Sequence, residues 1–168
     1  TIAVSIDAIG EKAAYIRSGL KWNKFLENIE LIKEQCPHIK LQIAPTVSNL
    51  SILSLCDVHQ FFVENSLIKM NDIYLNILDR PNYYNCKNSP KSVKEKSKEN
   101  LIAHIDWLNE NNASQVVIKE FEAVIEYMMT PANASDLKAF VQQTQKLDTI
   151  RNEDFNSIFP EFVHLSKT

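Results

Sequence analysis

Three short apolar runs predict three β-strands in the first half of the chain, at about residues 2–6, 39–44 and 72–78. In each run a large aliphatic residue recurs at every second position, which is the period of a strand. Small residues stand between the large ones in the first run, which fits a parallel strand covered on both faces. Pro45 closes the second run, because proline cannot continue a central ladder of hydrogen bonds.

Apolar residues at helical spacing predict at least five helices between and after these strands. The first extends from about Trp22 to Gln35 and ends before Pro37. In the second helix, His59 lies at the edge of the apolar stripe. The second helix and the three that dominate the second half of the chain cover about residues 51–65, 90–109, 117–128 and 136–147.

The order strand, helix, strand, helix, strand with short links indicates parallel strands joined by right-handed crossovers. Three such units form half of a barrel, so the predicted fold class is α/β, with a partial parallel (β/α) barrel over residues 1–81. A helical region over residues 82–168 packs on it, within the same domain or as a second one. A half barrel leaves its first strand with an unpaired edge, which is an aggregation hazard. We therefore expect the chain to be incomplete and an N-terminal half of the barrel to cover this edge.

Polar side chains follow the carboxyl ends of the predicted strands, where ligands bind in α/β sheets and barrels. These residues are Asp7, Arg17, Thr46, Asn49, Asp79 and Arg80. The chain has only three arginines against fifteen lysines, and a guanidinium suits the bidentate capture of a carboxylate or phosphate. We expect these side chains to converge on one mouth. Taken singly, each is equally explained by hydrogen bonds within a loop, and Asp7 by capping of the helix that follows it.

Composition and charge narrow the classes of function. A net charge of −3 gives no support for a nucleic-acid or anionic membrane surface, and the one basic cluster, residues 87–98, is mixed with glutamates as on a solvated helix face. No apolar stretch approaches the roughly 20 residues of a membrane helix, so we expect a cytoplasmic protein. With two glycines no GxGxxG fingerprint is possible, and HExxH is absent as well.

The cysteines do not predict a metal site. Cys36, Cys56 and Cys86 are odd in number and widely spaced, unlike a disulfide framework or a CxxC pair. Cys36 precedes the second predicted strand and Cys56 follows its other end, and a strand of six residues spans roughly 20 Å at ~3.3 Å per residue. Thiolates that far apart cannot share one cluster, so we expect three free thiols.

The segment Val4–Lys12, followed by Tyr15-Ile16-Arg17 and Lys21-Trp22, resembles the SIDG-type segment of radical S-adenosylmethionine enzymes. The similarity is to the twitch-domain subgroup common in phage and marine genomes. Further matches cover nearly the whole chain, at 45–50, 75–78, Pro81, Tyr83, 146–151, Asp154-Phe155 and 159–161. The family's CxxxCxxC motif, whose thiolates hold a [4Fe-4S] cluster, is not in this sequence. The resemblance therefore identifies the chain as the C-terminal half of such an enzyme.

This resemblance implies roles for individual residues. Ser5 looks like the serine of the fourth barrel strand that helps to hold the methionyl and ribose portion of S-adenosylmethionine. Asp7 and Arg17 are similar to the aspartate of that motif and the basic residue after it, and Thr46 and Asn49 to the polar residues that face the cofactor or substrate. Ala8 stands where the family has glycine. Because alanine disfavours positive φ, a turn that requires this geometry would alter the contact. The tail residues Asp148 and Arg151 look like a structural pair that docks the last helix.

The implied activity is reductive cleavage of S-adenosylmethionine by the cluster to a 5′-deoxyadenosyl radical, which abstracts hydrogen from a small-molecule or peptide substrate. The cofactors are S-adenosylmethionine and [4Fe-4S] in the full-length protein, and we expect neither to bind tightly to this chain alone. Two other classes stay open. One is a non-catalytic α/β interaction module that binds a partner through its helical second half, and the other a phosphate-binding α/β barrel enzyme that uses Arg17 and Arg80.

Overall fold

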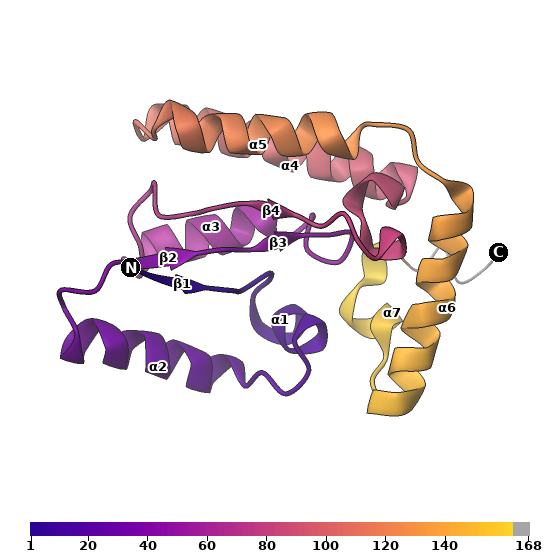
Figure 1. Ribbon diagram of the computed structural model, residues 1–168, viewed down its shortest axis with the longest axis horizontal. Coiled ribbons are helices and arrows are strands. Elements are labelled where there is room, and N and C mark those ends of the chain that lie inside the picture. The colour runs from indigo at the N-terminus through magenta and orange to yellow at the C-terminus, as the bar shows by residue number, and fades with distance from the viewer. Residues whose placement is uncertain (163–168) are drawn as a thin grey trace.

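The computed structural model describes residues 1–162, and short parallel strands lie at its centre (Figure 1). The strands are β1 (Ile2–Val4), β2 (Leu41–Ile43), β3 (Thr46–Val47) and β4 (Asn76–Ile77). β1 pairs with β2, and β3 pairs with β4, both in parallel. A parallel bridge between Ile43 and Ile73 joins the two pairs. Three stretches of chain therefore lie side by side in sequence order, which confirms the predicted parallel pairing, and within residues 1–162 they do not close into a barrel.

Helices connect the strands as the hydrophobic spacing predicts. α1 (Gly10–Ile16) and α2 (Trp22–Gln35) lie between β1 and β2, and α3 (Leu55–Glu64) lies between β3 and β4. α2 has the predicted bounds. Its Trp22 packs on Phe61 of α3 with ring centroids 5.6 Å apart, so the two crossover helices touch one another.

The second half of the chain is helical. Two short 3₁₀ turns, Asn82–Tyr84 and Cys86–Asn88, lead into α4 and α5, which pack along each other above β4, while α6 and α7 stand across the carboxyl ends of the strands (Figure 1). The bounds of these helices are α4 Lys91–Glu110, α5 Gln115–Met128, α6 Ala134–Arg151 and α7 Phe155–Ile158. The chain is thus mixed α/β and mostly helical. None of the helices described over residues 1–162 is both long and apolar enough to cross a membrane.

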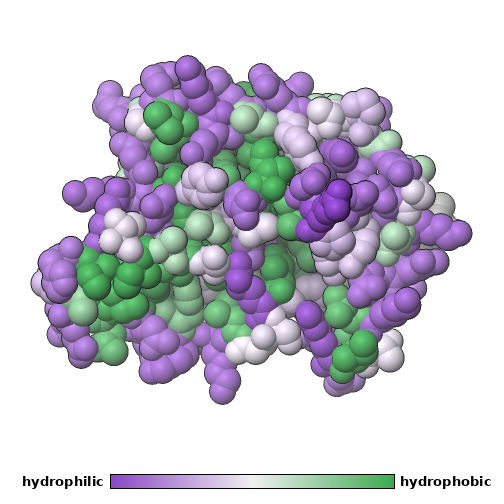
Figure 2. All heavy atoms as spheres, viewed as in Figure 1, coloured by the Kyte–Doolittle hydropathy of each residue, from purple (hydrophilic) through white to green (hydrophobic). Residues whose placement is uncertain are grey.

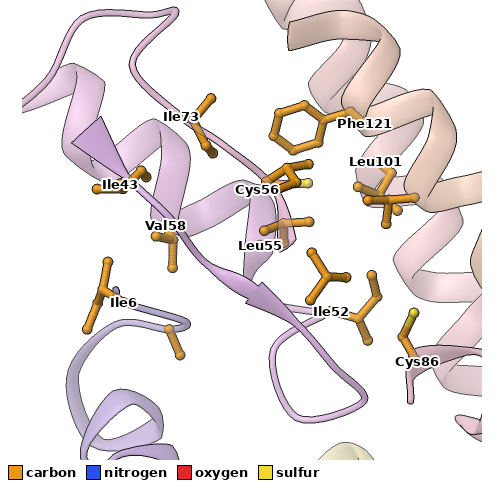
Figure 3. Close-up of a cluster of buried hydrophobic side chains, with 14 of the residues drawn as sticks. Ile6, Ile43, Ile52, Leu55, Cys56, Val58, Ile73, Cys86, Leu101 and Phe121 are labelled. Carbon is orange, nitrogen blue, oxygen red and sulfur yellow. The ribbon is translucent and has the colours of Figure 1, made fainter. Parts of the chain in front are cut away.

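One hydrophobic core joins both halves of the chain. Figure 3 shows Leu55 of α3 close to Leu101 of α4 and Phe121 of α5, with Ile43 of the sheet at the left. The same cluster of buried side chains continues to Phe162 at the end of the described chain. Burying a leucine or phenylalanine side chain contributes roughly 1.5–3 kcal/mol, so this shared core is the main stabilising contact between the sheet and the C-terminal helices.

The strands are shorter and β1 is more exposed than the alternation predicts. β1 was expected to be covered on both faces, but Ile2 is 38% exposed, because β1 is an edge strand with a neighbour on one side only. In the last strand, the Leu75 amide donates to the Glu120 carboxylate of α5 at 2.9 Å, so regular pairing starts only at Asn76. α3 begins at Leu55 and not at residue 51, since the Ser51 side chain bonds the preceding loop.

Candidate functional site

An open hollow of about 440 Å³ lies at the carboxyl ends of the strands, between the sheet, α1 and α6. Its polar lining residues are Asp7, Arg17, Thr46, Ser48, Gln143 and Arg151. Its aromatic and apolar lining residues are Tyr15, Ile16, Leu50, Leu78, Tyr84 and Leu147. Two of the chain's three arginines therefore face one hollow whose remaining wall is largely apolar.

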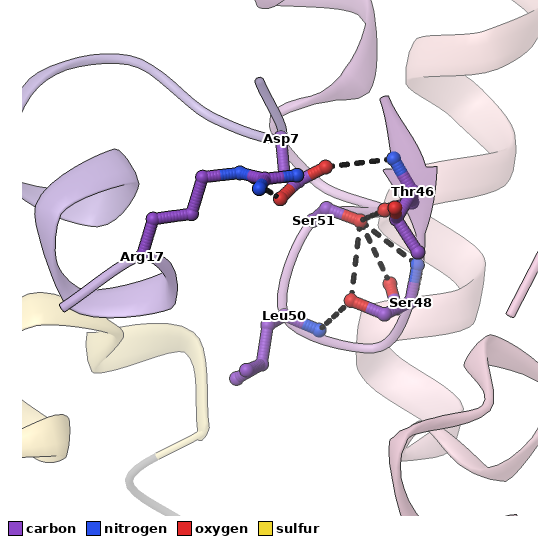
Figure 4. A network of polar contacts seen from close by, with 6 residues as sticks. All are labelled: Asp7, Arg17, Thr46, Ser48, Leu50 and Ser51. Carbon is purple, nitrogen blue, oxygen red and sulfur yellow. Dashed lines mark hydrogen bonds and ion pairs between the residues drawn. The ribbon is translucent and has the colours of Figure 1, made fainter. Parts of the chain in front are cut away.

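Asp7 anchors one wall of the hollow. Its side chain is 5% exposed, and one carboxylate oxygen accepts from the Thr46 amide at 2.7 Å, which links the end of β1 to the start of β3. The other oxygen lies 2.9 Å from Nε of Arg17, whose side chain is 37% exposed (Figure 4). Both oxygens of the buried carboxylate are thus compensated, as a buried charge requires. Asp7 consequently serves to hold Arg17 at the hollow and is not a free base.

Asp7 does not cap the following helix, which was the alternative explanation of this residue. The cap position of α1 is occupied by Ile9. The turn between β1 and α1 has its positive φ at Gly10, at 59°, whereas Ala8 is a buried core residue. Alanine in place of the family's glycine is therefore compatible with this turn, because the left-handed geometry falls two residues later.

The loop after β3 is shaped by two serines. The Ser51 hydroxyl donates to the Thr46 carbonyl at 2.6 Å and accepts from the Ser48 amide at 2.8 Å. The Ser48 hydroxyl accepts from the Leu50 amide at 3.3 Å (Figure 4). These bonds satisfy backbone groups of the loop between β3 and α3, and Ser48 and Leu50 of this loop lie on the wall of the hollow.

The residues predicted from the sequence do not all converge. Asp7, Arg17 and Thr46 line the hollow. Ser5 is exposed and lies outside it, and the side chain of Arg80 is 88% exposed, with its nearest acidic atom in Asp79 at 4.0 Å.

Asn49 is buried and binds the backbone instead of the hollow. Its amide nitrogen donates to the Tyr83 carbonyl at 2.9 Å and its backbone amide to the Tyr84 carbonyl at the same distance. Both bonds fasten the loop after β3 to the turn that carries Tyr84, a residue of the hollow. The effect of Asn49 on the hollow is therefore indirect, through the placement of Tyr84.

The tail residues Asp148 and Arg151 dock α6 onto α1. Asp148 accepts from the Tyr15 hydroxyl at 2.8 Å and from the Phe155 amide at 2.9 Å, and Arg151 donates to the Tyr15 carbonyl at 3.1 Å. Burial and the Asp148 carboxylate raise the pKa of Tyr15, so the phenol remains a donor at neutral pH. The docking role implied by the resemblance agrees with these contacts, but Arg151 also lines the hollow.

The lining residues that the sequence did not point to come mainly from distant segments. Gln143 and Leu147 reach the hollow because α6 folds back across the strand ends, whereas Tyr84 reaches it from the 3₁₀ turn after β4. No spacing along the chain signals this return, since the contacts join residues more than a hundred positions apart. Ser48 is different, because it belongs to the 45–50 segment that carries the resemblance.

The residues present do not fit an iron–sulfur cluster. Cys56 lies within α3 and Cys86 in the turn before α4, both among apolar side chains (Figure 3). Burial, which is the largest cause for each, raises the pKa of Cys56 to about 12 and that of Cys86 to about 11, so both stay protonated thiols. Within residues 1–162 no three histidine, cysteine or acidic side chains are grouped to hold a metal ion.

Comparison with known proteins adds no relative. No family model, no curated protein and no solved structure matches this chain.

Proposed function

We propose that the hollow binds S-adenosylmethionine and that the chain is the carboxyl-terminal half of a radical S-adenosylmethionine barrel. The observation that carries the proposal is Arg17, held by the buried Asp7 at the carboxyl end of a parallel sheet, facing an open hollow. This edge is where α/β folds bind ligands. The resemblance of the segment from Val4 to Arg17 supplies the identity of the ligand.

The chemistry of the lining supports a ligand with a charged end and an apolar body. A guanidinium has five N–H donors, and Arg17 is 37% exposed beside Asp7, so its exposed part retains donors for a carboxylate. Tyr84, Leu50 and Leu147 offer apolar surface of the kind that aromatic rings pack against. S-adenosylmethionine combines an amino acid carboxylate with an adenine ring and meets both requirements.

The protein's part in the reaction is to bind and orient this ligand. When bound beside a [4Fe-4S] cluster, S-adenosylmethionine supplies the radical that abstracts hydrogen from substrate. The side chains of this chain do not fit the cluster, so no electron-transfer step is assigned to them. In this proposal the cluster belongs to the N-terminal half of the barrel, which is the partner of the present chain.

Ligand-observed NMR with S-adenosylhomocysteine and S-adenosylmethionine tests the proposal. We expect weak binding, with a Kd on the order of 1 mM, because this chain supplies one part of the wall of the proposed binding site. Arg17→Ala abolishes this binding and Arg80→Ala, the matched exposed arginine, preserves it.

Two results would contradict the proposal. The first is equal binding by the Arg17→Ala variant and the unmodified chain, or no binding by either. The second is displacement of the nucleoside by inorganic phosphate at similar concentration, which favours the phosphate-binding alternative, since Arg17 and Arg151 both face the hollow.

A further inference from the structure

The outer edge of β1 has unused backbone hydrogen-bonding groups. The Ile2 amide donates to the Lys40 carbonyl and the Val4 carbonyl accepts from the Ala44 amide, both at 2.8 Å. Backbone groups of successive residues point to opposite sides of a parallel strand, so those of the exposed Ala3 point away from β2. Within residues 1–162, β2 is the only strand that pairs with β1. This edge is a template for one more strand.

The outer face of α2, which lies beside β1 in Figure 1, is open and has two leucines among polar residues. Leu31 is 47% exposed, and an open hollow of about 640 Å³ runs along α2 past Leu26 and Leu31. In Figure 2 hydrophobic surface gathers at the lower left, over α2 and the start of the chain seen in Figure 1. The edge of β1 and this face of α2 together are called the edge surface below.

Carboxylates surround the apolar part of the edge surface. The acidic lining residues of the hollow are Glu27, Glu30 and Glu34, which lie on the exposed side of α2. Lys24 lies 3.0 Å from Glu27 and offsets its charge, so the negative charge at this rim comes mainly from the exposed Glu30 and Glu34. A partner that covers Leu31 therefore meets carboxylates at its rim.

We propose that the edge surface docks a strand–helix unit of a partner, whose strand pairs with β1 and whose helix lays a leucine-rich face with flanking lysines or arginines on α2. The strand satisfies the backbone groups of Ala3, and the helix covers Leu26 and Leu31. Basic residues at the helix rim complement Glu30 and Glu34. In the proposed barrel this unit is the neighbour of β1. The edge surface shares no residue with the ligand hollow, so either proposal can fail while the other holds.

A second copy of this chain is a poorer occupant. Two copies related by a twofold axis bring the same surface of each together. The glutamates of both α2 helices then lie in one contact, and like charges at an interface oppose association. The edge surface is therefore built for a partner of opposite charge and not for itself.

Fluorescence anisotropy with synthetic strand–helix peptides tests this inference. The probe peptide has a valine- and threonine-rich strand, a short loop and an amphipathic helix with leucines on one face and lysines beside them. The matched peptide has glutamates in place of the lysines. We expect the lysine peptide to bind roughly tenfold more tightly at low salt, with the difference reduced by added salt. Amide exchange at Ala3 slows when the lysine peptide is bound.

Two variants sharpen the test, and circular dichroism verifies that both fold. Glu30→Lys combined with Glu34→Lys reverses the preference between the two peptides, and Leu31→Asp weakens binding of both. Failure of the lysine peptide to bind, equal binding of the two peptides, or an unchanged Ala3 exchange rate would each overturn the proposal. Sedimentation showing a dimer that Leu31→Asp dissociates would replace it with self-association.

Discussion

At the scale of single residues, a buried histidine pair joins α3 to α4. Nδ1 of His59 lies 2.9 Å from Nε2 of His104, and Nε2 of His59 lies 3.0 Å from the Met70 carbonyl. Because a carbonyl only accepts, His59 carries its proton on Nε2, and its Nδ1 accepts from His104. Nδ1 of His104 then has no partner among residues 1–162. Both rings are neutral, and Trp107 stacks on His104 with centroids 5.1 Å apart.

The pair makes stability depend on pH. Burial lowers the pKa of His59 to about 4, and burial with the neighbouring His59 lowers the pKa of His104 to about 3. Below the ordinary value of about 6.5 the unfolded chain therefore binds protons that the folded chain does not. The free energy of unfolding is at its maximum above this value. It falls as the pH decreases toward the folded-state values, by up to ~1.4 kcal/mol per pH unit for each histidine.

Urea unfolding followed by circular dichroism at pH 7 and pH 5 measures this effect. We expect the free energy of unfolding to be lower at pH 5 than at pH 7, by on the order of 2 kcal/mol per histidine. His104→Phe reduces the slope, since one of the two titrations is gone and the aromatic contact with Trp107 is kept. His38→Gln, at an exposed histidine, leaves the slope unchanged. A denaturation midpoint that is equal at both pH values contradicts the prediction.

At the scale of elements, the contact between α1 and α6 forms the far wall of the hollow. Tyr15 of α1 binds Asp148 and Arg151 of α6, and its ring packs edge-on against Phe159 with centroids 5.4 Å apart. A hydrogen bond to a charged group contributes roughly 1.5–3 kcal/mol. Arg151 is held at the hollow by the Tyr15 carbonyl and by Glu153, which lies 3.8 Å away, and the Tyr15 hydroxyl adds the contact with Asp148.

Tyr15→Phe removes the hydroxyl and keeps the ring. We expect the free energy of unfolding to fall by about 1.5–3 kcal/mol, since the part-buried Asp148 carboxylate loses a donor. Tyr74→Phe is the matched control at an exposed tyrosine and changes stability little. Thermal unfolding with a denaturant series measures both, and equal stability of the two variants would show that the Tyr15 hydroxyl contributes nothing net.

At the scale of the whole molecule, the sheet and the C-terminal helices share their core. Leu101 of α4 is buried in the same cluster as Leu55 of α3 and Ile43 of β2. Removing side chains from such a core costs the transfer free energy and leaves a cavity. We therefore expect both halves of the chain to unfold together, although the sequence left open whether they form one domain or two.

Two tryptophans report on the halves separately, Trp22 in α2 and Trp107 in α4. In the variants Trp22→Phe and Trp107→Phe the remaining fluorescence follows one half, and we expect coincident urea transitions. Leu101→Ala shifts both transitions to lower urea by the same amount, equivalent to about 2–5 kcal/mol. Transitions that separate, or a shift confined to Trp107, would show two domains.

Elements with local signals can be predicted from the amino-acid sequence. The bounds of α2 follow from apolar spacing that ends before Pro37, and the parallel strands follow from their alternation with helices over short links. Asp7, Arg17 and Thr46 could be placed at one end of the sheet for the same reason, because parallel strands bring their carboxyl ends to one edge.

The residues that complete the hollow, and the partners of several charged side chains, follow from the packing of the folded chain. Gln143 and Arg151 reach the hollow because α6 folds back across the strand ends. Glu120 of α5 accepts a hydrogen bond from the Leu75 amide, which shortens β4. The apolar stripe put His59 at a helix edge, whereas its contact with His104 places it in the core. Each of these contacts joins segments whose proximity depends on the packing of the whole chain, and periodicity along the sequence carries no information about such pairs.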